Sequence, residues 1–251
     1  MSSQSAPWRT VWISGASSGL GEHVARLLAQ QGCHVAISAR SEDKLNAIAA
    51  GNNNISVWPL DVTDAAACKE TAHAIEAAHG TIDLALFSAG AWFQSSVEEL
   101  RVENYQKTFD VNVMGVVHCV DGVLPQMLAR GGGHIAWVSS VAGYGGLPLS
   151  GSYSASKSAL ICLAETMKPE LDAKGVTLSV VNPGFVKTDM TASNKFPMPF
   201  LMEVEDAAHK MVEGLKRKKF EVAFPWQLVT ILKVLNLLPY WLYFAITKRM
   251  V

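Results

Sequence analysis

A tyrosine and a lysine four residues apart, Tyr153 and Lys157, could together perform proton transfer. Positions i and i+4 of a helix lie on one face about one turn apart, so a helix here would hold the phenol beside the ammonium. A lysine charge ~5 Å away would lower the pKa of a tyrosine, ordinarily near ~10, by roughly two at an effective dielectric of ~20. The spacing therefore predicts proton exchange near neutral pH. A solvated helix surface can carry the same spacing, so the pair alone leaves both interpretations open.

A glycine-rich turn near the N-terminus could bind a phosphate group. The sequence SGASSGLG, Ser14 to Gly21, follows an apolar run and precedes a helical pattern. Gly15 favours a tight turn, Gly19 lets a ligand approach the backbone, and Gly21 allows close packing of helix on sheet. The N–H groups and positive dipole end of that helix would bind a pyrophosphate. The binding residues expected in the turn are Gly15, Ser17, Ser18, Gly19, Leu20 and Gly21.

The end of the second predicted strand indicates which dinucleotide would bind. An acidic residue about 20 positions past the glycines would hold a ribose 2′-hydroxyl. Arg40 stands in that region instead, within ISARSEDK. A guanidinium suits a 2′-phosphate through its charge and its forked hydrogen bonds. The sequence therefore predicts NADP(H) over NAD(H), with a solvated surface arginine as the alternative.

The elements that must position these residues alternate along the chain. Seven apolar or β-branched runs are expected to be strands: Thr10–Ser14, His34–Ala39, Ile55–Trp58, Asp83–Ser88, His134–Ser139, Val176–Val181 and Phe220–Phe224. Helices are expected at Gly19–Gln31, Glu42–Ala50, Asp64–His79, Val97–Arg130, Ser152–Lys174 and Val204–Lys218. This alternation predicts an α/β fold: one Rossmann-like domain over residues 1–225, with a doubly wound parallel seven-stranded sheet and helices on both faces.

An apolar helical extension is expected at residues 226–251, and three interpretations of it are open. The uncharged stretch between Lys233 and Lys248 has only 14 residues and contains Pro239, which is short of the ~20 residues that a spanning helix needs. The extension could pack on the core or on a partner subunit. It could also attach to a membrane surface through its aromatic residues, with Lys248 and Arg249 on headgroups. A spanning helix fits least well.

The overall composition argues against several classes of protein. With 251 residues, 49% hydrophobic and 17% charged, the chain is not expected to be disordered. A net charge of −1 gives no reason to expect nucleic-acid binding. The cysteines (Cys33, Cys68, Cys119 and Cys162) lie far apart and the histidines are scattered, so we expect reduced thiols and no metal site. The N-terminus lacks the apolar segment of a signal peptide, which favours a cytoplasmic location, with membrane-surface contact through the extension as an option.

Taken together, these motifs resemble the short-chain dehydrogenase/reductase family over roughly residues 9–225. The matching residues, in chain order, are Gly15, Gly19, Gly21, Asp61, Val62, Ser88, Ala89, Gly90, Asn112, Ser140, Tyr153, Lys157, Pro183, Gly184 and Thr188. Ser14 stands where the family usually has threonine, and Ser88 where it usually has asparagine. The shorter Ser88 side chain puts some sheet stability or cofactor affinity in question.

The resemblance implies that a nicotinamide cofactor delivers hydride to a carbonyl carbon while Tyr153 protonates the carbonyl oxygen. Ser140 would be the second donor to that oxygen, Lys157 would hold the nicotinamide ribose, and Asn112 would position a water. The cofactor contacts implied beyond the glycine turn and Arg40 are Asp61, Val62, Ala89, Gly90, Tyr153, Lys157, Pro183, Gly184, Val186 and Thr188. The resemblance also implies a homodimer or homotetramer built on the long helices.

Loops past the strand ends are expected to form the substrate wall. The candidates are apolar or aromatic: Trp92, Phe93, Tyr144, Leu147, Phe185, Met190 and Phe196, with Lys187–Met202 as a lid. They favour a bulky lipophilic ketone, aldehyde or alcohol, whose identity and direction of conversion stay open. Two other functions also stay open: a non-enzymatic NADPH sensor or interaction protein on the same fold, and a membrane-surface scaffold.

Overall fold

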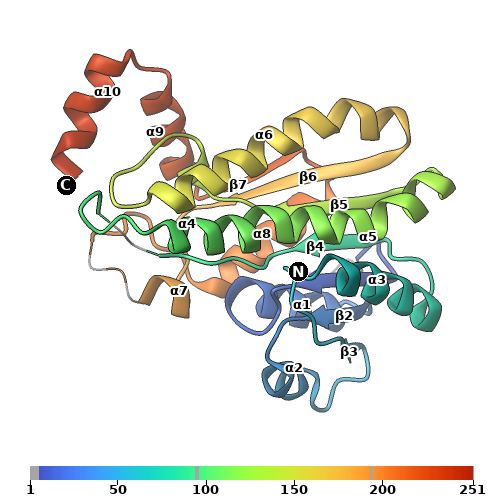
Figure 1. Ribbon diagram of the computed structural model, residues 1–251. Helices are drawn as coiled ribbons and strands as arrows, with labels where there is room; N and C mark the ends of the chain where they lie inside the picture. Colours follow the sequence, from blue (N-terminus) through green and yellow to red (C-terminus); the bar gives the residue numbers. More distant parts are fainter. Residues whose placement is uncertain (1–5, 94–95, 193, 195, 251) are drawn as a thin grey trace.

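A seven-stranded parallel sheet forms the centre of the molecule (Figure 1), in the order β3-β2-β1-β4-β5-β6-β7. The computed structural model describes residues 6–93, 96–192, 194 and 196–250. The strands are β1 (Thr10–Ser14), β2 (His34–Ser38), β3 (Ile55–Val57), β4 (Leu84–Phe87), β5 (Gly133–Val138), β6 (Val176–Pro183) and β7 (Glu221–Phe224). The predicted doubly wound parallel sheet is confirmed.

Helices cover both faces of the sheet, and each face has its own apolar core. The helices are α1 (Gly19–Gln30), α2 (Glu42–Ala49), α3 (Ala65–His79), α4 (Val102–Phe109), α5 (Gly115–Arg130), α6 (Gly151–Ala173), α7 (Asp189–Ala192), α8 (Val204–Lys216), α9 (Trp226–Asn236) and α10 (Tyr240–Thr247). Successive strand residues point to opposite faces. In β1, Val11 and Ile13 pack with residues of α1, α2 and α8, whereas Trp12 packs with residues of α3, α5 and α6. Burial on both faces explains why the strands are almost continuously apolar.

The long helix expected over Val97–Arg130 is shorter and is interrupted. It begins at Val102, because the preceding residues form a turn in which the Glu99 N–H bonds to Ser96. A π-helical turn at Asp110–Met114 then separates α4 from α5. In the part of the chain that the structure describes, the run from Val102 to Arg130 is long and apolar enough to cross a bilayer. However, α5 buries Cys119 in the core against the sheet, so its apolar character is explained by packing.

The strand order of the sheet reverses between the neighbouring strands β1 and β4. From β1 the chain continues to β2 and β3 on one side, and it then returns to β4 on the other side of β1. The loops at the carboxyl ends of β1 and β4 therefore diverge and leave a crevice, which is where ligands bind in open α/β sheets. The glycine turn after β1 and residues Ser88–Gly90 after β4 both lie at this switch point.

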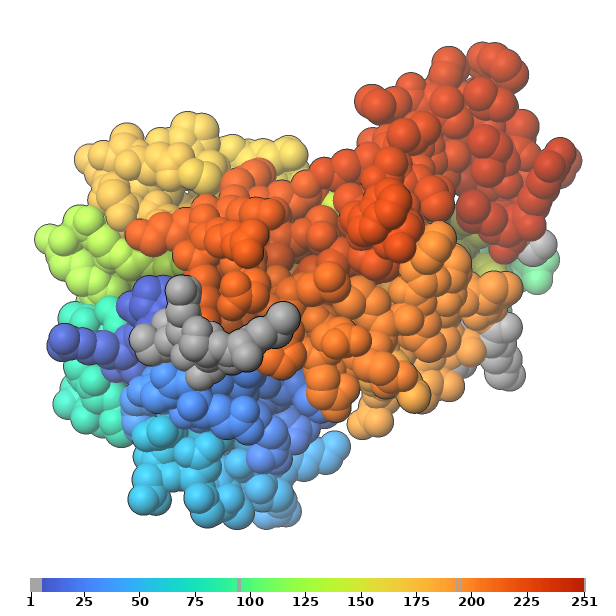
Figure 2. All heavy atoms as spheres, turned by 180° about the vertical axis from the view of Figure 1, so that it is seen from behind, coloured from blue at the N-terminus to red at the C-terminus, as the bar shows by residue number. Residues whose placement is uncertain are grey.

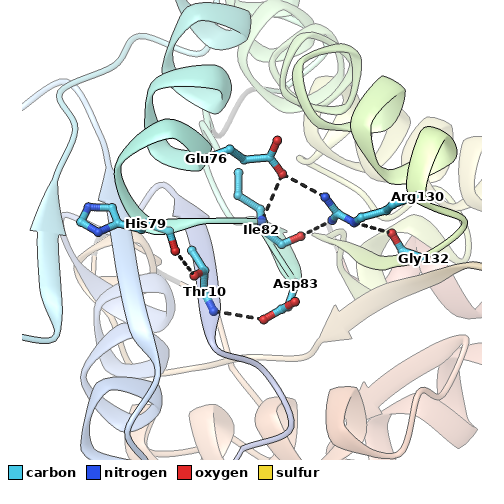
Figure 3. Close-up of polar contacts among 7 residues, drawn as sticks. All are labelled: Thr10, Glu76, His79, Ile82, Asp83, Arg130 and Gly132. Carbon is cyan, nitrogen blue, oxygen red and sulfur yellow. Dashed lines mark hydrogen bonds and ion pairs between the residues drawn. The ribbon is translucent and has the colours of Figure 1, made fainter.

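The amino ends of the same strands are tied together by polar contacts (Figure 3). The Arg130 guanidinium at the end of α5 donates to Glu76 Oε1 at 3.0 Å, to the Ile82 carbonyl at 2.5 Å and to the Gly132 carbonyl at 2.9 Å. Glu76 also accepts from the Ile82 N–H at 3.0 Å. This network links α3, the start of β4 and the end of α5.

The C-terminal extension forms the helix pair α9 and α10, which stands off from the sheet (red in Figures 1 and 2). One side of it packs on the body of the molecule, which was one of the expected interpretations. Leu228 and Leu235 of α9 are buried, and so is Tyr243 of α10. The Tyr243 hydroxyl donates to the Gly146 carbonyl at 2.5 Å.

Candidate active site

A cavity of about 440 Å³ lies at the carboxyl ends of the strands. Every residue that the sequence assigned to dinucleotide binding lines it: Gly15, Ser17, Ser18, Gly19, Leu20, Gly21, Arg40, Asp61, Val62, Ala89, Gly90, Tyr153, Lys157, Pro183, Gly184, Val186 and Thr188. These residues come from five strand ends and from α6, so the parallel sheet is what gathers them. Their individual contacts with a cofactor stay predictions.

The glycine turn has the close backbone approaches that a phosphate cradle needs. A Cβ atom at Gly15 would lie 2.3 Å from the Ala89 nitrogen, and one at Gly21 would lie 2.4 Å from the Gly15 carbonyl oxygen. Side chains are therefore excluded where the loop turns into α1. Ser18, the residue before α1, makes no side-chain cap to the helix, so N–H groups of the first turn are left for an anion. The turn fits a pyrophosphate.

At the other end of this cavity, three side chains offer hydrogen-bond donors: Arg40, Ser41 and Lys44. Arg40 makes no side-chain hydrogen bond or ion pair with any residue that the structure describes. The pKa of the Asp61 carboxyl is lowered mainly by the hydrogen bond from the Thr63 N–H, and the charge of Arg40 adds to this effect. The sequence analysis missed Ser41 and Lys44, although both follow Arg40 within one helical turn. This end fits a phosphate on the adenosine ribose.

Lys157 is held inside the cavity wall rather than in solvent. Its Nζ donates to the Val138 carbonyl at 2.8 Å and lies 5.5 Å from the centroid of the Tyr153 ring. Burial lowers the pKa of Lys157 to about 8. The ammonium form therefore still predominates at neutral pH, beside the phenol as the spacing predicted.

Tyr153 does not have the lowered pKa that the spacing predicted. Burial raises the pKa of Tyr153, and a hydrogen bond with Ser140 offsets only part of this. The reason is geometric, because Lys157 faces the ring and gives its hydrogen bond to Val138 rather than to the phenol oxygen. The edge of Trp92 packs against the same ring, with centroids 5.1 Å apart. The Tyr153 phenol is therefore protonated at neutral pH.

Ser140 lies where β5 ends and a 3₁₀ turn, Val141–Gly143, begins. Its hydroxyl oxygen accepts from the Ala142 N–H at 3.1 Å, and its proton points to the Pro183 carbonyl 3.4 Å away. The cap holds the hydroxyl beside Tyr153, and both side chains line this cavity.

Asn112 occupies the π turn, is fully buried and does not line this cavity. Its side-chain oxygen accepts from the Ala91 N–H at 2.7 Å. Its amide donates to the Ala91 carbonyl at 3.1 Å and to the Ser156 hydroxyl at 3.0 Å. Asn112 therefore ties the loop after β4 to α6, which makes it a positioning residue. The water expected beside it stays a prediction.

A second cavity, of about 540 Å³ and mostly apolar walls, adjoins the first. The residues that line both cavities are Ser140, Tyr153, Gly184, Met190 and Thr191. Of the expected substrate residues, the second cavity has Trp92, Leu147, Phe185, Met190 and Phe196 in its wall. Tyr144 and Phe93 are not among the lining residues. Tyr144 is turned away because its hydroxyl donates to Glu221 at 2.7 Å, and burial, with this bond, raises the pKa of Tyr144.

The comparison with known families decides which proteins this chain is related to. The profile described as short chain dehydrogenase matches residues 9–197. The chain belongs to the short-chain dehydrogenase family. Among its curated relatives, an uncharacterized oxidoreductase of Myxococcus xanthus is 40% identical over 250 residues, which cover 97% of this chain and 98% of the relative. One of Staphylococcus epidermidis is 32% identical over 204 residues, which cover 81% and 89% of the two chains.

Solved structures resemble this short-chain dehydrogenase over nearly its full length. A short-chain dehydrogenase from Streptomyces avermitilis superimposes with a TM-score of 0.83 at 22% identity, over 96% of this chain and 97% of that one. ElxO with NADP bound gives a TM-score of 0.77 at 24% identity, over 86% of this chain and 97% of that one. At these identities the likeness establishes the shared fold.

The second cavity of this short-chain dehydrogenase is also lined by residues that the sequence did not indicate. Four come from the C-terminal extension: Leu228, Leu232, Arg249 and Met250. The expected lid also contributes lining residues, and it leaves and rejoins the body where Val186 pairs with Met202. No local signal marks the extension as part of the site, because its contact with the cavity depends on how α9 folds back over Gly184, whose Cβ would meet Leu228 at 2.8 Å.

Proposed function

We propose that this short-chain dehydrogenase is an NADP(H)-dependent oxidoreductase that interconverts a lipophilic ketone or aldehyde with its alcohol. The observation that carries the proposal is the meeting of a glycine-rich cavity and an apolar cavity at Tyr153 and Ser140. A carbonyl group placed at that junction would be within reach of both hydroxyl donors. Bound NADP(H) would supply or accept the hydride.

The protein's own residues would manage the proton and the developing charge. Tyr153 donates its proton to the carbonyl oxygen, and Ser140 donates a hydrogen bond to the same atom. The nearby Lys157 ammonium stabilises the phenolate that remains. Because burial raises the pKa of Tyr153, the phenol is protonated before the reaction. This state favours carbonyl reduction over alcohol oxidation.

The preference for NADP(H) rests on the donor group at the end of β2. Arg40 and Lys44 supply two positive charges there and Ser41 supplies a hydroxyl, which together suit a 2′-phosphate. The solved structure of ElxO, which shares the fold, has NADP bound, and this supports the same choice here.

The substrate class follows from the second cavity. Its volume of about 540 Å³ lies within the ~300–1,000 Å³ range of small-molecule sites. Trp92, Leu147 and Phe185 give it aromatic and aliphatic walls, so a bulky apolar group beside the carbonyl would be bound by desolvation.

The test is NADPH consumption by the purified protein against ketones and aldehydes graded by size and lipophilicity, with NADPH binding measured in parallel. We expect oxidation of NADPH with bulky apolar carbonyls and little with small polar ones. Tight NADPH binding without oxidation across the whole panel would contradict the proposal and favour a non-enzymatic NADPH-binding protein.

We also propose that the protein is a homodimer or homotetramer, from the family resemblance, and that it is cytoplasmic, from its free and widely separated cysteines. Light scattering during size-exclusion chromatography would give the number of subunits, and cell fractionation would give the location. A monomer would contradict the first proposal, and secretion would contradict the second.

A further inference from the structure

The outer side of the C-terminal extension exposes large apolar side chains in helical register. In α9, Leu228 and Leu235 face the body, whereas Ile231 and Val234 face outward and are more than half exposed. The connection to α10 is more exposed still, with Leu237 at 83%. An amphipathic helix ordinarily turns its apolar stripe inward, but α9 has apolar residues on both sides.

Aromatic residues continue this surface along α10. Tyr240 is 78% exposed and Trp241 is 74% exposed, and the rings of Tyr240 and Phe244 stack with centroids 5.7 Å apart. Among the described residues of the extension, the exposed large apolar side chains are Trp226, Ile231, Val234, Leu237, Tyr240, Trp241, Phe244, Ile246 and Met250. Figure 2 shows this segment, in red, projecting beyond the rest of the molecule. Large apolar side chains exposed together on one projecting segment are typical of contact sites.

The charge of the extension is opposite to that of the rest of the chain. Residues 226–251 contain three basic residues, Lys233, Lys248 and Arg249, and no acidic residue. Within a chain of net charge −1, the extension therefore carries +3 and the other residues −4. Lys233 faces the body, where it pairs with Glu221. Lys248 and Arg249 are exposed in the 3₁₀ turn that follows α10, and Arg249 also lines the second cavity. Exposed cations beside exposed aromatic rings complement an anionic lipid surface.

We propose that the C-terminal extension docks this protein on an anionic lipid bilayer. The two helices have 11 and 8 residues and are separated by Pro239, so each is too short to span the ~30 Å hydrocarbon core. They instead lie in the interface, with Leu237, Tyr240 and Trp241 among the acyl chains and Lys248 near the headgroups.

The bilayer explains this surface better than a second copy of the chain does. Trp and Tyr side chains have a polar edge and an apolar body, which suits the boundary between headgroups and acyl chains. The tip of a projecting element can enter a bilayer without burying the rest of the body. A symmetric pairing of two extensions would instead bring two sets of positive charges together without an acidic partner from the extension.

The inner side of the extension lines the second cavity through Leu228 and Leu232 of α9. Docking would therefore bring that cavity to the lipid surface. This consequence rests on the proposed function, because it gives a lipophilic carbonyl compound a route from the bilayer to Tyr153. The docking itself does not depend on catalysis.

The test is flotation of the full-length protein with vesicles of phosphatidylcholine, with and without an equal part of phosphatidylglycerol. We expect binding to the anionic vesicles, and a drop in affinity of about tenfold or more for Leu237→Glu and for Trp241→Glu. The matched control is Leu128→Glu, which makes the same substitution at an exposed apolar residue near the end of α5. This variant should bind the vesicles as the wild type does. Tryptophan quenching by brominated lipid should decrease in Trp241→Phe, which keeps the apolar surface but removes the probe.

Two results would overturn the proposal. One is the absence of binding to either vesicle type. The other is a dimer in solution that Leu237→Glu and Trp241→Glu convert to monomer, since that would assign the surface to a second copy. Because flotation does not involve turnover, its failure is distinguishable from a failure of NADPH consumption on water-soluble ketones.

Discussion

Two arginines at opposite ends of the same sheet are surrounded very differently. Arg130, at the amino ends of the strands, makes hydrogen bonds to Glu76, Ile82 and Gly132, as Figure 3 shows. Arg40, at the carboxyl end of β2, lines a cavity and makes none with the described residues. A guanidinium with every partner supplied by the chain contributes to folding, whereas one without partners is left for a ligand. The difference indicates a role in stability at one end and, under the proposed function, in cofactor binding at the other.

The buried titratable groups at the two ends differ in the same way. His134 is the second residue of β5 and lies at the amino end of the sheet. Burial lowers the pKa of His134 to about 4, so the ring is neutral at neutral pH. Lys157 faces the carboxyl end, and burial lowers its pKa only to about 8, so it stays charged at neutral pH. The protein therefore keeps a buried charge at the end where the proposed chemistry takes place.

The largest effect should come from Tyr153→Phe. Removing the hydroxyl removes the proton donor and leaves the ring and its contact with Trp92 in place. We expect turnover with a ketone to fall by about 10²- to 10⁴-fold, with an unchanged melting temperature. Steady-state NADPH consumption and thermal unfolding would measure the two.

The control for this variant is the affinity for NADPH, which should change little in Tyr153→Phe. Turnover near the wild-type rate would remove Tyr153 from the mechanism. A large loss of stability would instead show that this end of the sheet also supports the fold, and the contrast between the two ends would be lost.

The second prediction concerns the folding stability contributed by the amino end of the sheet, which should depend on pH. The Ser179 hydroxyl donates to the Lys219 carbonyl, so it accepts from His134 Nε2, 2.8 Å away. The other ring nitrogen, Nδ1, is buried and has no partner among the described residues. A proton there would be a buried, unpaired charge. The unfolded chain binds that proton below its ordinary pKa of 6.5, whereas the folded chain does so only near 4.

Stability linked to His134 should therefore be complete above pH about 6.5 and fall as the pH drops towards about 4, by up to about 3 kcal/mol. Urea unfolding across this range would measure the loss. In His134→Asn, which cannot titrate, this part of the pH dependence should disappear. An identical slope in the variant and in the wild type would show that other groups cause it.

Much of the fold and of the cofactor cavity could be predicted because the signals are local. A glycine turn after a strand, or Arg40 at a strand end, is positioned by its own strand. A parallel sheet then brings all strand ends to one edge. This is why the residues from Gly15 to Thr188 assigned to the dinucleotide line one cavity, although they are far apart in the chain.

What could not be predicted depends on contacts between distant residues. Tyr144 left the expected substrate wall because Glu221, 77 positions away, accepts its hydroxyl proton. Leu228 entered that wall because α9 folds back over the end of β6. The raised pKa of Tyr153 follows from burial, which spacing alone does not reveal, since i and i+4 positions fix a distance but not the surroundings.

A third prediction tests the amino end by removing its central cation. Arg130→Ala deletes three hydrogen bonds and leaves the Ile82 carbonyl and the Glu76 carboxylate without this donor. Because the side chain is partly exposed, we expect the free energy of unfolding to fall by only about 2 kcal/mol. Denaturant unfolding would measure this, and ketone reduction at a temperature where the variant is folded should be unchanged.

The matched control is Lys187→Ala, which removes an exposed ion pair with Glu203 and should cost about 0.5 kcal/mol or less. Equal losses in the two variants would mean that the network in Figure 3 is no more stabilising than a surface pair. Lower turnover by folded Arg130→Ala would show that the two ends of the sheet are coupled.

The smallest of these effects is expected at Arg40, where the ligand and not the chain should supply the partner. Arg40→Ala should raise the dissociation constant for NADPH by about tenfold, because Lys44 and Ser41 still face a 2′-phosphate. Affinity for NADH, which lacks that phosphate, should stay the same, and so should stability, since Arg40 makes no hydrogen bond that the structure describes. Titration of both cofactors into the wild type and the variant would give the constants. Equal constants for the two cofactors in the wild type, or an unchanged NADPH constant in the variant, would mean that an arginine without partners at this edge is only a solvated charge.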